Sequence, residues 1–361
     1  MKDLDFKHGG NVYSHAKKLN LLPSEIIDSS ASLVPFEPPK ILLDSLSLEI
    51  KTGGFRYYPE SNLNNLKEII GEFHQINPNN ILPGNGASEL ITWAGYEASK
   101  YGESSIPSPS FIDYERSLNC WNAKFTYSEL PKNWNSIFPQ SFPIKPNCDV
   151  LWITNPHNPT GQLWNKKSLE IILKKYKLVI CDEAFLAITP KGEKESLIPL
   201  TKTYDNLLVI RSLTKLFNMA GLRLGYVIGS QEKLRKWNIK RDPWPLNSFA
   251  IKAGIELLSN KIFYEEWTKK IHDWINTEKQ WVSNELSKIN HLKIYHSSTN
   301  FFLIESKYSL SSNIEYLANK GILIRECSSF KFLNEKWARI SLQNNKNNKI
   351  LCREIQNSFK K

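Results

Sequence analysis

The sequence predicts an α/β fold, with a large domain built on a mainly parallel sheet between helices and a smaller α+β domain. From about residue 50 to about 240, short apolar runs typical of buried strands alternate with helical patterns, and this order implies right-handed crossovers between parallel strands. After Asp242-Pro243-Trp244-Pro245 the pattern changes to long helices followed by a few strand-like runs. We expect residues 1–48 to be an N-terminal segment that joins the small domain, 49–245 to form the large domain and 246–361 the small one.

The elements of the large domain are predicted in chain order. A helix is indicated over residues 63–73, where apolar residues lie three or four apart, and a second helix begins within the glycine-rich run 83–89. A third helix is indicated by the apolar spacing between residues 169 and 173. Continuous apolar runs predict four buried strands, at residues 150–153, 178–181, 207–210 and 224–228.

The small domain is predicted from its spacing of tryptophans and isoleucines. Trp267, Ile271, Trp274 and Trp281 recur at helical spacing, and we interpret them as core or packing residues of a long helix. The run Asn344 to Lys349 is expected to be an exposed turn before a last helix. Strands are predicted at 292–305, 322–326 and 337–342.

The amino-acid composition limits the classes of protein to which this chain can belong. Hydrophobic residues make up 41% and charged residues 23% of 361 residues, which is ordinary for a globular protein, and no apolar run approaches the length of a membrane span. We therefore expect a cytoplasmic protein that does not bind a membrane. The five cysteines are scattered, which favours neither disulfides nor a metal site. The net charge of +11 is spread along the chain without a DNA-binding pattern, so we expect a solvated surface and no nucleic-acid partner.

The chemistry is indicated first by the run Ser212-Leu213-Thr214-Lys215, with Arg223 eight residues after the lysine. An amine, a hydroxyl and a guanidinium at these spacings suit a small phosphorylated aldehyde, because the amine can form an imine while the other two groups bind the phosphate. The run lies between two predicted strands, so the turn is expected at the edge of the sheet. A short pattern of this kind carries weight only in such a context.

This arrangement resembles the lysine site of fold-type I pyridoxal-phosphate (PLP) enzymes, the aspartate aminotransferase superfamily. The resemblance implies that Lys215 binds the cofactor covalently and that Ser212 and Arg223 hold its phosphate. It also implies that Asn158, in Asn155-Pro156-His157-Asn158-Pro159-Thr160-Gly161, bonds the phenolic oxygen of PLP. Asp182, at the end of the strand 178–181, matches the carboxylate that pairs with the pyridine nitrogen and favours its protonated form. Lys215 and Asp182 are the expected catalytic residues.

Further cofactor contacts are expected upstream. Glycines allow close approach of the backbone, and the start of a helix offers free N–H groups to an anion. The phosphate cradle is therefore predicted at Gly86, Ala87 and Ser88. Either Phe111 or Tyr114 is expected to stack on the cofactor, and the sequence does not choose between them. Tyr58 matches a tyrosine that in relatives reaches the cofactor phosphate of the neighbouring subunit, which implies a homodimer.

Residues outside the cofactor cluster point to the substrate. Arg339 matches the strand arginine that binds a substrate α-carboxylate, and Arg325 is a second cation, so a substrate with more than one anionic group is expected. The N-terminal segment, with His8 and Gly9, resembles threonine-phosphate decarboxylases, which make aminopropanol phosphate for the cobalamin side arm. By position, His8, Gly9, Ser32, Asn158, Arg325 and Arg339 are the expected substrate contacts.

Two departures from the family pattern affect this interpretation. The decarboxylases carry an asparagine where this chain has Ser32, which weakens the resemblance. Aminotransferases typically carry a tyrosine where this chain and the decarboxylases have Phe185, which strengthens it. Histidinol-phosphate aminotransferase remains the close alternative, since it shares nearly all these motifs. A regulator that kept only the fold is a third hypothesis, disfavoured by the presence of Lys215 and by our expectation of no room for a DNA-binding domain before His8.

Overall fold

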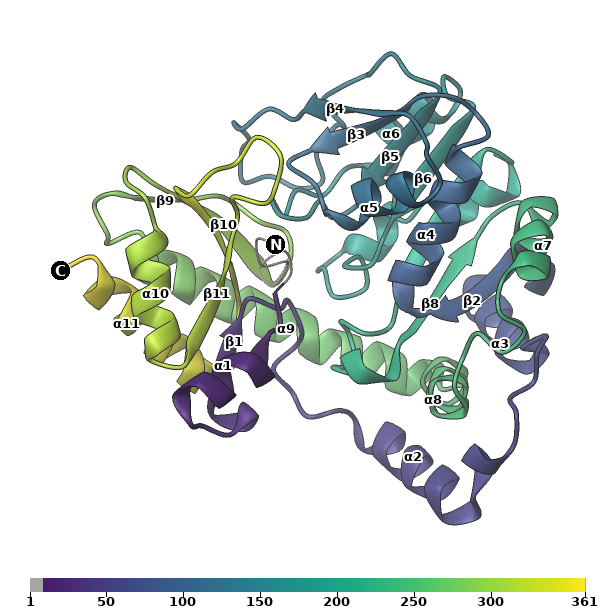
Figure 1. Cartoon of the computed structure of the whole chain (residues 1–361), viewed down its shortest axis with the longest axis horizontal. Helices are drawn as coiled ribbons and strands as arrows, with labels where there is room; N and C mark the ends of the chain where they lie inside the picture. The colour runs from purple at the N-terminus through teal and green to yellow at the C-terminus, as the bar shows by residue number, and fades with distance from the viewer. Residues whose placement is uncertain (1–8, 361) are drawn as a thin grey trace.

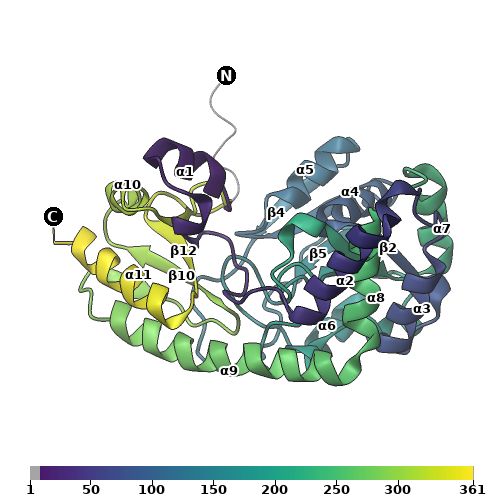
Figure 2. The same ribbon diagram turned by 90° about the horizontal axis from the view of Figure 1, so that it is seen from below.

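The computed structural model describes residues 9–360, which form two sheets joined by long helices. Figure 1 shows the larger sheet on one side of the molecule and the smaller sheet on the other. One long helix, α9 (Lys261–Leu286), runs along the base of both parts, as Figure 2 shows from below. This arrangement confirms the predicted α/β fold with a large and a small sheet.

The large sheet has seven strands in the order β2-β8-β7-β6-β5-β3-β4. All neighbouring strands pair in parallel except β8, which is antiparallel to both β2 and β7. The prediction of a mainly parallel sheet is therefore confirmed. The bounds are β2 Ile81–Asn85, β3 Ser104–Ser108, β4 Phe125–Glu129, β5 Val150–Thr154, β6 Leu178–Asp182, β7 Leu207–Ser212 and β8 Leu224–Ile228.

Helices cover both faces of this sheet, which explains why its central strands β5, β6 and β7 begin with four consecutive apolar residues each. Side chains alternate along a strand, so Leu151 and Ile153 of β5 join one core cluster while Val150 and Trp152 join the other. The first face is covered by α3 (Asn64–His74), α6 (Lys166–Leu173) and α8 (Ser248–Ser259). The second face is covered by α4 (Gly86–Ala98), α5 (Asp113–Cys120) and α7 (Gln231–Lys240).

The small sheet has the order β1-β11-β12-β10-β9, and its edge strand comes from the start of the chain. β1 pairs in parallel with β11, so the N-terminal segment joins this sheet. The strands are β1 Ile27–Ser29, β9 Leu292–Ile294, β10 Phe301–Ser306, β11 Ile322–Glu326 and β12 Trp337–Ser341. The helices around it are α1 Val12–Leu19, α10 Ser311–Asn319 and α11 Asn345–Ser358.

Two predictions for the small domain were wrong in detail. The run 292–305 was predicted as one strand, but it forms β9 and β10, which pair antiparallel after the chain turns back. The run Asn344 to Lys349 is not a turn, because the Asn344 side chain accepts a hydrogen bond from the Asn347 N–H and caps α11. Asn348 lies buried in the first turns of that helix.

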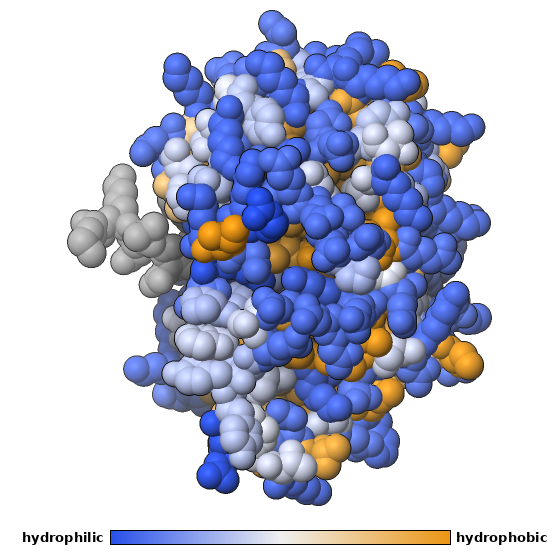
Figure 3. Space-filling view, turned by 90° about the vertical axis from the view of Figure 1, so that its right-hand side faces the viewer, coloured by the Kyte–Doolittle hydropathy of each residue, from blue (hydrophilic) through white to orange (hydrophobic). Residues whose placement is uncertain are grey.

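The domain boundaries stay predictions. Residue 48 lies within α2 (Lys40–Thr52), which packs against α8, and residue 245 lies just before α8. In Figure 1, α2 lies at the bottom of the molecule. In residues 9–360 we find no helix with the length and apolar character needed to cross a membrane. The face drawn in Figure 3 is mainly hydrophilic, with hydrophobic residues scattered over it, as expected for a surface rich in lysine.

Candidate active site

A cavity of about 230 Å³ lies where the central strands of the large sheet end. Parallel strands place their carboxyl ends along one edge, so residues that follow β5, β6 and β7 meet there. The small sheet contributes the opposite wall. The lining residues are Gly9, Ser30, Ala31, Ser32, Ala87, Ser88, Ile91, Phe111, Tyr114, Thr154, Asn158, Asp182, Ala184, Phe185, Ser212, Thr214, Lys215, Arg223 and Arg339.

Lys215 follows β7 and points into this cavity, with its Nζ 5.5 Å from the centre of the Phe185 ring. Burial lowers the pKa of its amine to about 8, and the positive charges of Arg339 and Arg223 lower it in the same direction. Asp182 opposes this shift. A buried lysine with a lowered pKa is suited to nucleophilic attack on an aldehyde, because more of it is neutral near neutral pH.

Asp182 ends β6 and is held by two donors. The Tyr114 hydroxyl donates to its Oδ2 at 2.7 Å, and the Ala184 N–H donates to its Oδ1 at 2.9 Å. Burial raises the pKa of Asp182 even so, since these donors and Lys215 only partly offset the loss of water. A protonated pyridine nitrogen beside this carboxylate would supply the missing opposite charge.

The two aromatic candidates for stacking occupy different environments. Tyr114 is 1% exposed, and its hydroxyl is also 2.8 Å from Thr154 Oγ1. Its role is therefore to orient the Asp182 carboxylate by a hydrogen bond. Phe111 is only partly buried and lines the cavity. The structure thus favours Phe111 as the stacking ring, and stacking itself stays a prediction.

The predicted phosphate site lies where β2 turns into α4. Gly86 has φ +74°, and a Cβ there would lie 2.5 Å from Arg223 Nη2, so only glycine lets the guanidinium approach the start of the helix. Ala87 and Ser88 line the cavity with Ser212 and Arg223. The Ser88 hydroxyl donates to Asp113 Oδ2 at 3.0 Å. Ser88 lies in the first turn of α4, whose N–H groups have no partner within the helix and would be the donors to an anion.

Asn158 and Arg339 are joined across the cavity. The Arg339 guanidinium donates from Nη1 to Asn158 Oδ1 and from Nη2 to the Ser30 carbonyl at 2.8 Å. Because the amide oxygen of Asn158 is occupied, its NH₂ group is the part that can donate to a ligand. Burial, together with the positive charge of the nearby Arg325, lowers the pKa of Arg339 to about 10.

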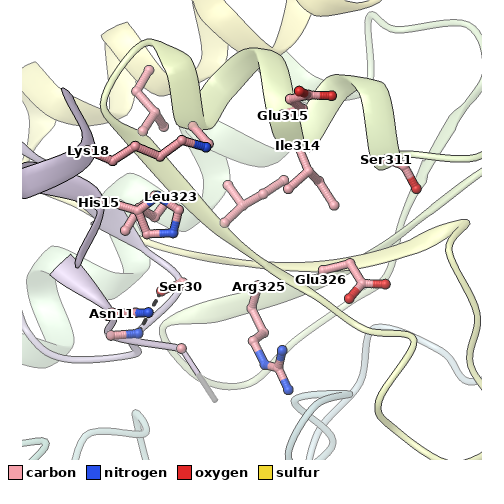
Figure 4. Close-up of a pocket in the computed structure, with 15 residues that line it drawn as sticks. Asn11, His15, Lys18, Ser30, Ser311, Ile314, Glu315, Leu323, Arg325 and Glu326 are labelled. Carbon is pink, nitrogen blue, oxygen red and sulfur yellow. Dashed lines mark hydrogen bonds between the residues drawn. The ribbon is translucent and has the colours of Figure 1, made fainter. Parts of the chain in front are cut away.

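Arg325 lies outside this cavity, although it is the register partner of Arg339 on the neighbouring strand. Its Nη2 donates to Ser329 Oγ at 2.6 Å, and its guanidinium is 5.2 Å from the centre of the Phe330 ring. It lines an adjoining cavity of about 350 Å³ between α1, α10 and β11, shown in Figure 4. Gly9 and Ser30 line both cavities, so the two spaces adjoin.

The remaining substrate candidates lie at the start of the chain. Ser32 is buried, and its Oγ is 2.7 Å from Ser341 Oγ, so its hydroxyl is already engaged. Gly9 packs closely on the next segment, since a Cβ there would lie 2.4 Å from the Ser30 carbonyl oxygen. His8 falls outside the described residues.

Tyr58 does not reach the cavity of its own chain. It is 78% exposed and stacks on Trp244, with ring centres 4.3 Å apart. Its role stays a prediction that concerns a second copy of the chain.

Sequence reasoning missed several residues that line the cavity. Thr154 ends β5 and contacts Tyr114, and Thr214 lies between Ser212 and Lys215. Their positions at strand ends were a usable signal, because the expected cofactor residues follow the same strands. The Ser30 carbonyl accepts a hydrogen bond from Arg339, but the sequence gave no signal for this contact, since the two residues lie 309 positions apart in the chain.

The donor set fits PLP. The anion site matches the phosphate, the Asp182 carboxylate matches the pyridine nitrogen, and the Lys215 amine matches the aldehyde. The Asn158 NH₂ group matches the phenolic oxygen. Among the described residues no group of three or more acidic, histidine or cysteine side chains is placed to hold a metal ion.

Comparison with known proteins agrees with this chemistry. The model of the family described as aminotransferase class I and II matches residues 24–355. A provisionally named threonine-phosphate decarboxylase of Caldanaerobacter subterraneus subsp. tengcongensis is 32% identical, over 98% of this chain and 94% of its own length. The threonine-phosphate decarboxylase of Salmonella typhimurium is 27% identical, over 97% of this chain and 96% of its own.

A solved structure shows the same fold. The histidinol-phosphate aminotransferase of Clostridium acetobutylicum superposes with a TM-score of 0.81 and 27% identity, covering 93% of this chain and 99% of that one. The family match spans most of the chain, and one cavity brings together Lys215, Asp182, Ser212 and Arg223. The chain therefore belongs to the class I and II aminotransferases, a family of PLP-dependent enzymes.

Proposed function

We propose that this enzyme decarboxylates a phosphorylated amino acid, with threonine phosphate as the substrate and aminopropanol phosphate for the cobalamin side arm as the product. The names of the two decarboxylase relatives and their nearly full coverage of the chain support this substrate class. The resemblance of the N-terminal segment and of Phe185 to the decarboxylases supports it further.

The observation that carries the proposal is the pair Arg325 and Arg339. They are opposite each other on neighbouring antiparallel strands, so both side chains leave the same face of the small sheet. Within residues 9–360 the buried Arg339 Nε has no hydrogen-bond partner, which leaves it a donor for a substrate carboxylate. Arg325 lines the adjoining cavity, so two cations can serve a substrate that carries a carboxylate and a phosphate.

In this reaction the residues of the chain would have separate roles. PLP, when bound, supplies an electron sink for the carbon that loses a substituent. Arg339 would hold the substrate carboxylate, and its bond to Asn158 Oδ1 orients that amide, whose NH₂ group would donate to the phenolic oxygen of PLP. Carbon dioxide leaves as the bond between Cα and the carboxyl carbon breaks, and a proton must take its place. We assign that proton to Lys215 Nζ, whose lowered pKa makes it a ready donor and acceptor near neutral pH.

Transamination by a histidinol-phosphate aminotransferase is the second candidate. It is favoured by the structural similarity to the Clostridium acetobutylicum enzyme, at an identity comparable to that of the Salmonella decarboxylase. In that reaction Lys215 would move a proton from Cα instead of supplying one in place of carbon dioxide. Both reactions use the same cavity, so the assay must separate them.

The test is a paired assay of the purified PLP-loaded enzyme. We expect carbon dioxide and aminopropanol phosphate from threonine phosphate, and no glutamate from histidinol phosphate with 2-oxoglutarate. Arg339→Lys is expected to lower kcat/KM for threonine phosphate by about 100-fold, because an ammonium cannot make the same paired contacts with a carboxylate. Glutamate formation without carbon dioxide release would replace the proposal by the second candidate.

We also propose that the enzyme is a cytoplasmic homodimer. All five cysteines are free, as expected in a reducing compartment. Exposed aromatic residues gather around Tyr58, where Phe55 and Tyr57 precede it and Trp244 stacks on it. A solvent-facing aromatic cluster of this kind is typical of a surface that another chain covers.

A further inference from the structure

Two charged residues lie directly next to the cofactor residues but on the other face of the sheet. In β6 and β7, Ile180 and Ile210 join the core cluster under α4 and α5, whereas Cys181 and Val209 join the opposite cluster. Because side chains alternate, Asp182 and Ser212 continue the first set. Glu183 and Arg211 continue the second set, and neither of them lines the cavity.

Arg211 and Glu183 lie at the core of a dense ionic network. Arg211 Nε is 2.9 Å from Glu183 Oε2, with side-chain exposures of 4% and 0%. Glu193, which the short helix η5 (Gly192–Glu195) brings in from the surface, accepts from Arg211 Nη1 at 2.7 Å and from Nη2 at 2.8 Å. The Ser196 hydroxyl and the Leu197 N–H donate to the two oxygens of Glu183 at 2.8 and 2.7 Å.

This network takes over where the backbone pairing of β6 and β7 stops. Their register pairs run from Val179 with Leu207 to Asp182 with Ile210, and the Glu183 N–H donates to the Ile210 carbonyl at 2.9 Å. The next pair in this register is Glu183 with Arg211, whose side chains form the ion pair. Arg211 and Ser212 remain paired with β8, so β7 is still held on that side. The network therefore ties the end of β6 to β7 beyond the point where their own backbone pairing ends.

Stability alone does not account for such an arrangement. Taking an arginine and a glutamate out of water costs several kcal/mol for each ion, about as much as their attraction returns, and apolar residues of similar volume often serve as well. The two ions are, however, covalently next to the carboxylate and the hydroxyl expected to bind opposite ends of PLP. A rigid separation between those two groups is what such a ligand requires.

We propose that Arg211, Glu183 and Glu193 are positioning residues that fix the distance between the Asp182 carboxylate and the Ser212 end of the phosphate site. They act through the strand ends of β6 and β7 and do not touch the ligand. Ligands that span both anchors depend on this separation, whereas a ligand that uses only the phosphate site does not.

The experiment compares two ligands on the cofactor-free protein. A triple variant, Arg211→Met with Glu183→Gln and Glu193→Gln, removes all three charges, leaves no ion unpaired and keeps an amide oxygen at residue 183 as an acceptor for the buried donors. We expect a melting temperature near that of the parent, a Kd for PLP at least about tenfold weaker and an unchanged Kd for inorganic phosphate. Hydrogen exchange of the peptide over residues 207–215 is expected to be faster in the same protein.

The matched control is Glu278→Gln, which alters another buried carboxylate, bonded by Asn348 Nδ2 at 2.8 Å in the small domain. This variant is expected to keep both affinities. A folded triple variant with the parental Kd for PLP overturns the proposal, and so does an equal loss for both ligands, which indicates a merely structural role. If the triple variant does not fold, the Kd for PLP is measured for Glu193→Gln alone, because this variant keeps the ion pair of Arg211 with Glu183. An unchanged Kd for PLP in Glu193→Gln then contradicts the proposal. Failure of the parent to decarboxylate threonine phosphate does not affect this test, because it measures no turnover.

Discussion

At the scale of single residues, burial shifts the pKa values of the charged groups in the site. Lys215 and Asp182 both lose water, and each shifts toward its neutral form, the amine by a lowered pKa and the carboxylate by a raised one. Neither group has an opposite charge close enough to bring its pKa back to the ordinary value. The cofactor-free cavity is therefore prepared for a ligand that brings an aldehyde to the amine and a positive charge to the carboxylate.

The first prediction concerns the pH dependence of Lys215. With a pKa of about 8, half of the amine is neutral at pH 8, compared with about 0.3% for a lysine with the ordinary value of 10.5. Competitive acetylation of the cofactor-free protein should give a midpoint near pH 8 at Lys215. In Arg339→Gln the midpoint should rise, because a nearby positive charge is removed. A midpoint above 10 in the parent would contradict this assignment.

The same shift has a consequence for stability. The folded protein releases the Lys215 proton at a lower pH than the unfolded chain does, so between about pH 8 and 10.5 the unfolded state binds more protons. This group therefore destabilises the cofactor-free protein below pH 8, and its contribution improves as the pH rises through that window. Lys215→Met should remove this part of the dependence of the free energy of unfolding on pH, measured by urea titration.

The next prediction concerns Phe185 and Asn158, which are expected to flank the phenolic oxygen of PLP. A hydrogen-bond donor to that oxygen stabilises its negatively charged form. It therefore lowers the pKa of the imine that Lys215 forms with the cofactor. Phe185→Tyr adds a donor and should lower the pH at which the yellow absorbance of the bound cofactor fades. Asn158→Ala removes a donor and should raise it. Spectral titration of both variants beside the parent is the measurement, and the absence of a shift in both would mean that they do not flank this oxygen.

At the scale of elements, the turn from β2 into α4 decides whether the anion site forms. Gly86→Ala introduces a Cβ that would lie 2.5 Å from Arg223 Nη2, at a backbone φ of +74°. We expect it to cost about 1–3 kcal/mol of stability and to weaken phosphate binding by about tenfold. Gly221→Ala is the matched control on the other side of Arg223, because nothing lies within 4 Å of its added Cβ. Thermal unfolding and phosphate titration of the two variants test this, and equal behaviour would contradict it.

Elements also show what the sequence could predict. The strands β5 to β8 were predictable because helices bury both of their faces, which makes long stretches of them apolar. Site residues lie at or soon after the ends of β5, β6 and β7, and Arg223 lies just before β8. The break between β9 and β10 also carried a signal that the prediction missed, because residues 296–300, His-Ser-Ser-Thr-Asn, form a polar run of the kind that marks a loop between two strands. The contact of Tyr114 with Asp182 joins residues 68 positions apart, so the aromatic that supports the carboxylate could not be told from the one that faces the cavity.

At the scale of the whole molecule, one chain supplies almost every group that the proposed chemistry needs. The small sheet brings Arg339, the large sheet brings Lys215 and Asp182, and the start of the chain closes the cavity with Gly9 and Ser30. Tyr58 is the exception, because it lies on the surface with Trp244 and does not line the cavity of its own chain. The proposed dimer makes a specific claim about which chain each site residue comes from.

The last prediction tests that claim with hybrid dimers. Tyr58→Ala and Lys215→Ala should each be nearly inactive alone, because every site in either dimer lacks one group. If Tyr58 serves the neighbouring site, a hybrid of the two variants contains one site with both lesions and one intact site. Random mixing should then restore about one quarter of the parental activity, since half of the dimers are hybrids and each has one working site. If Tyr58 serves its own chain, every site in the hybrid lacks one group and mixing restores nothing, as it also must if the active protein sediments as a monomer.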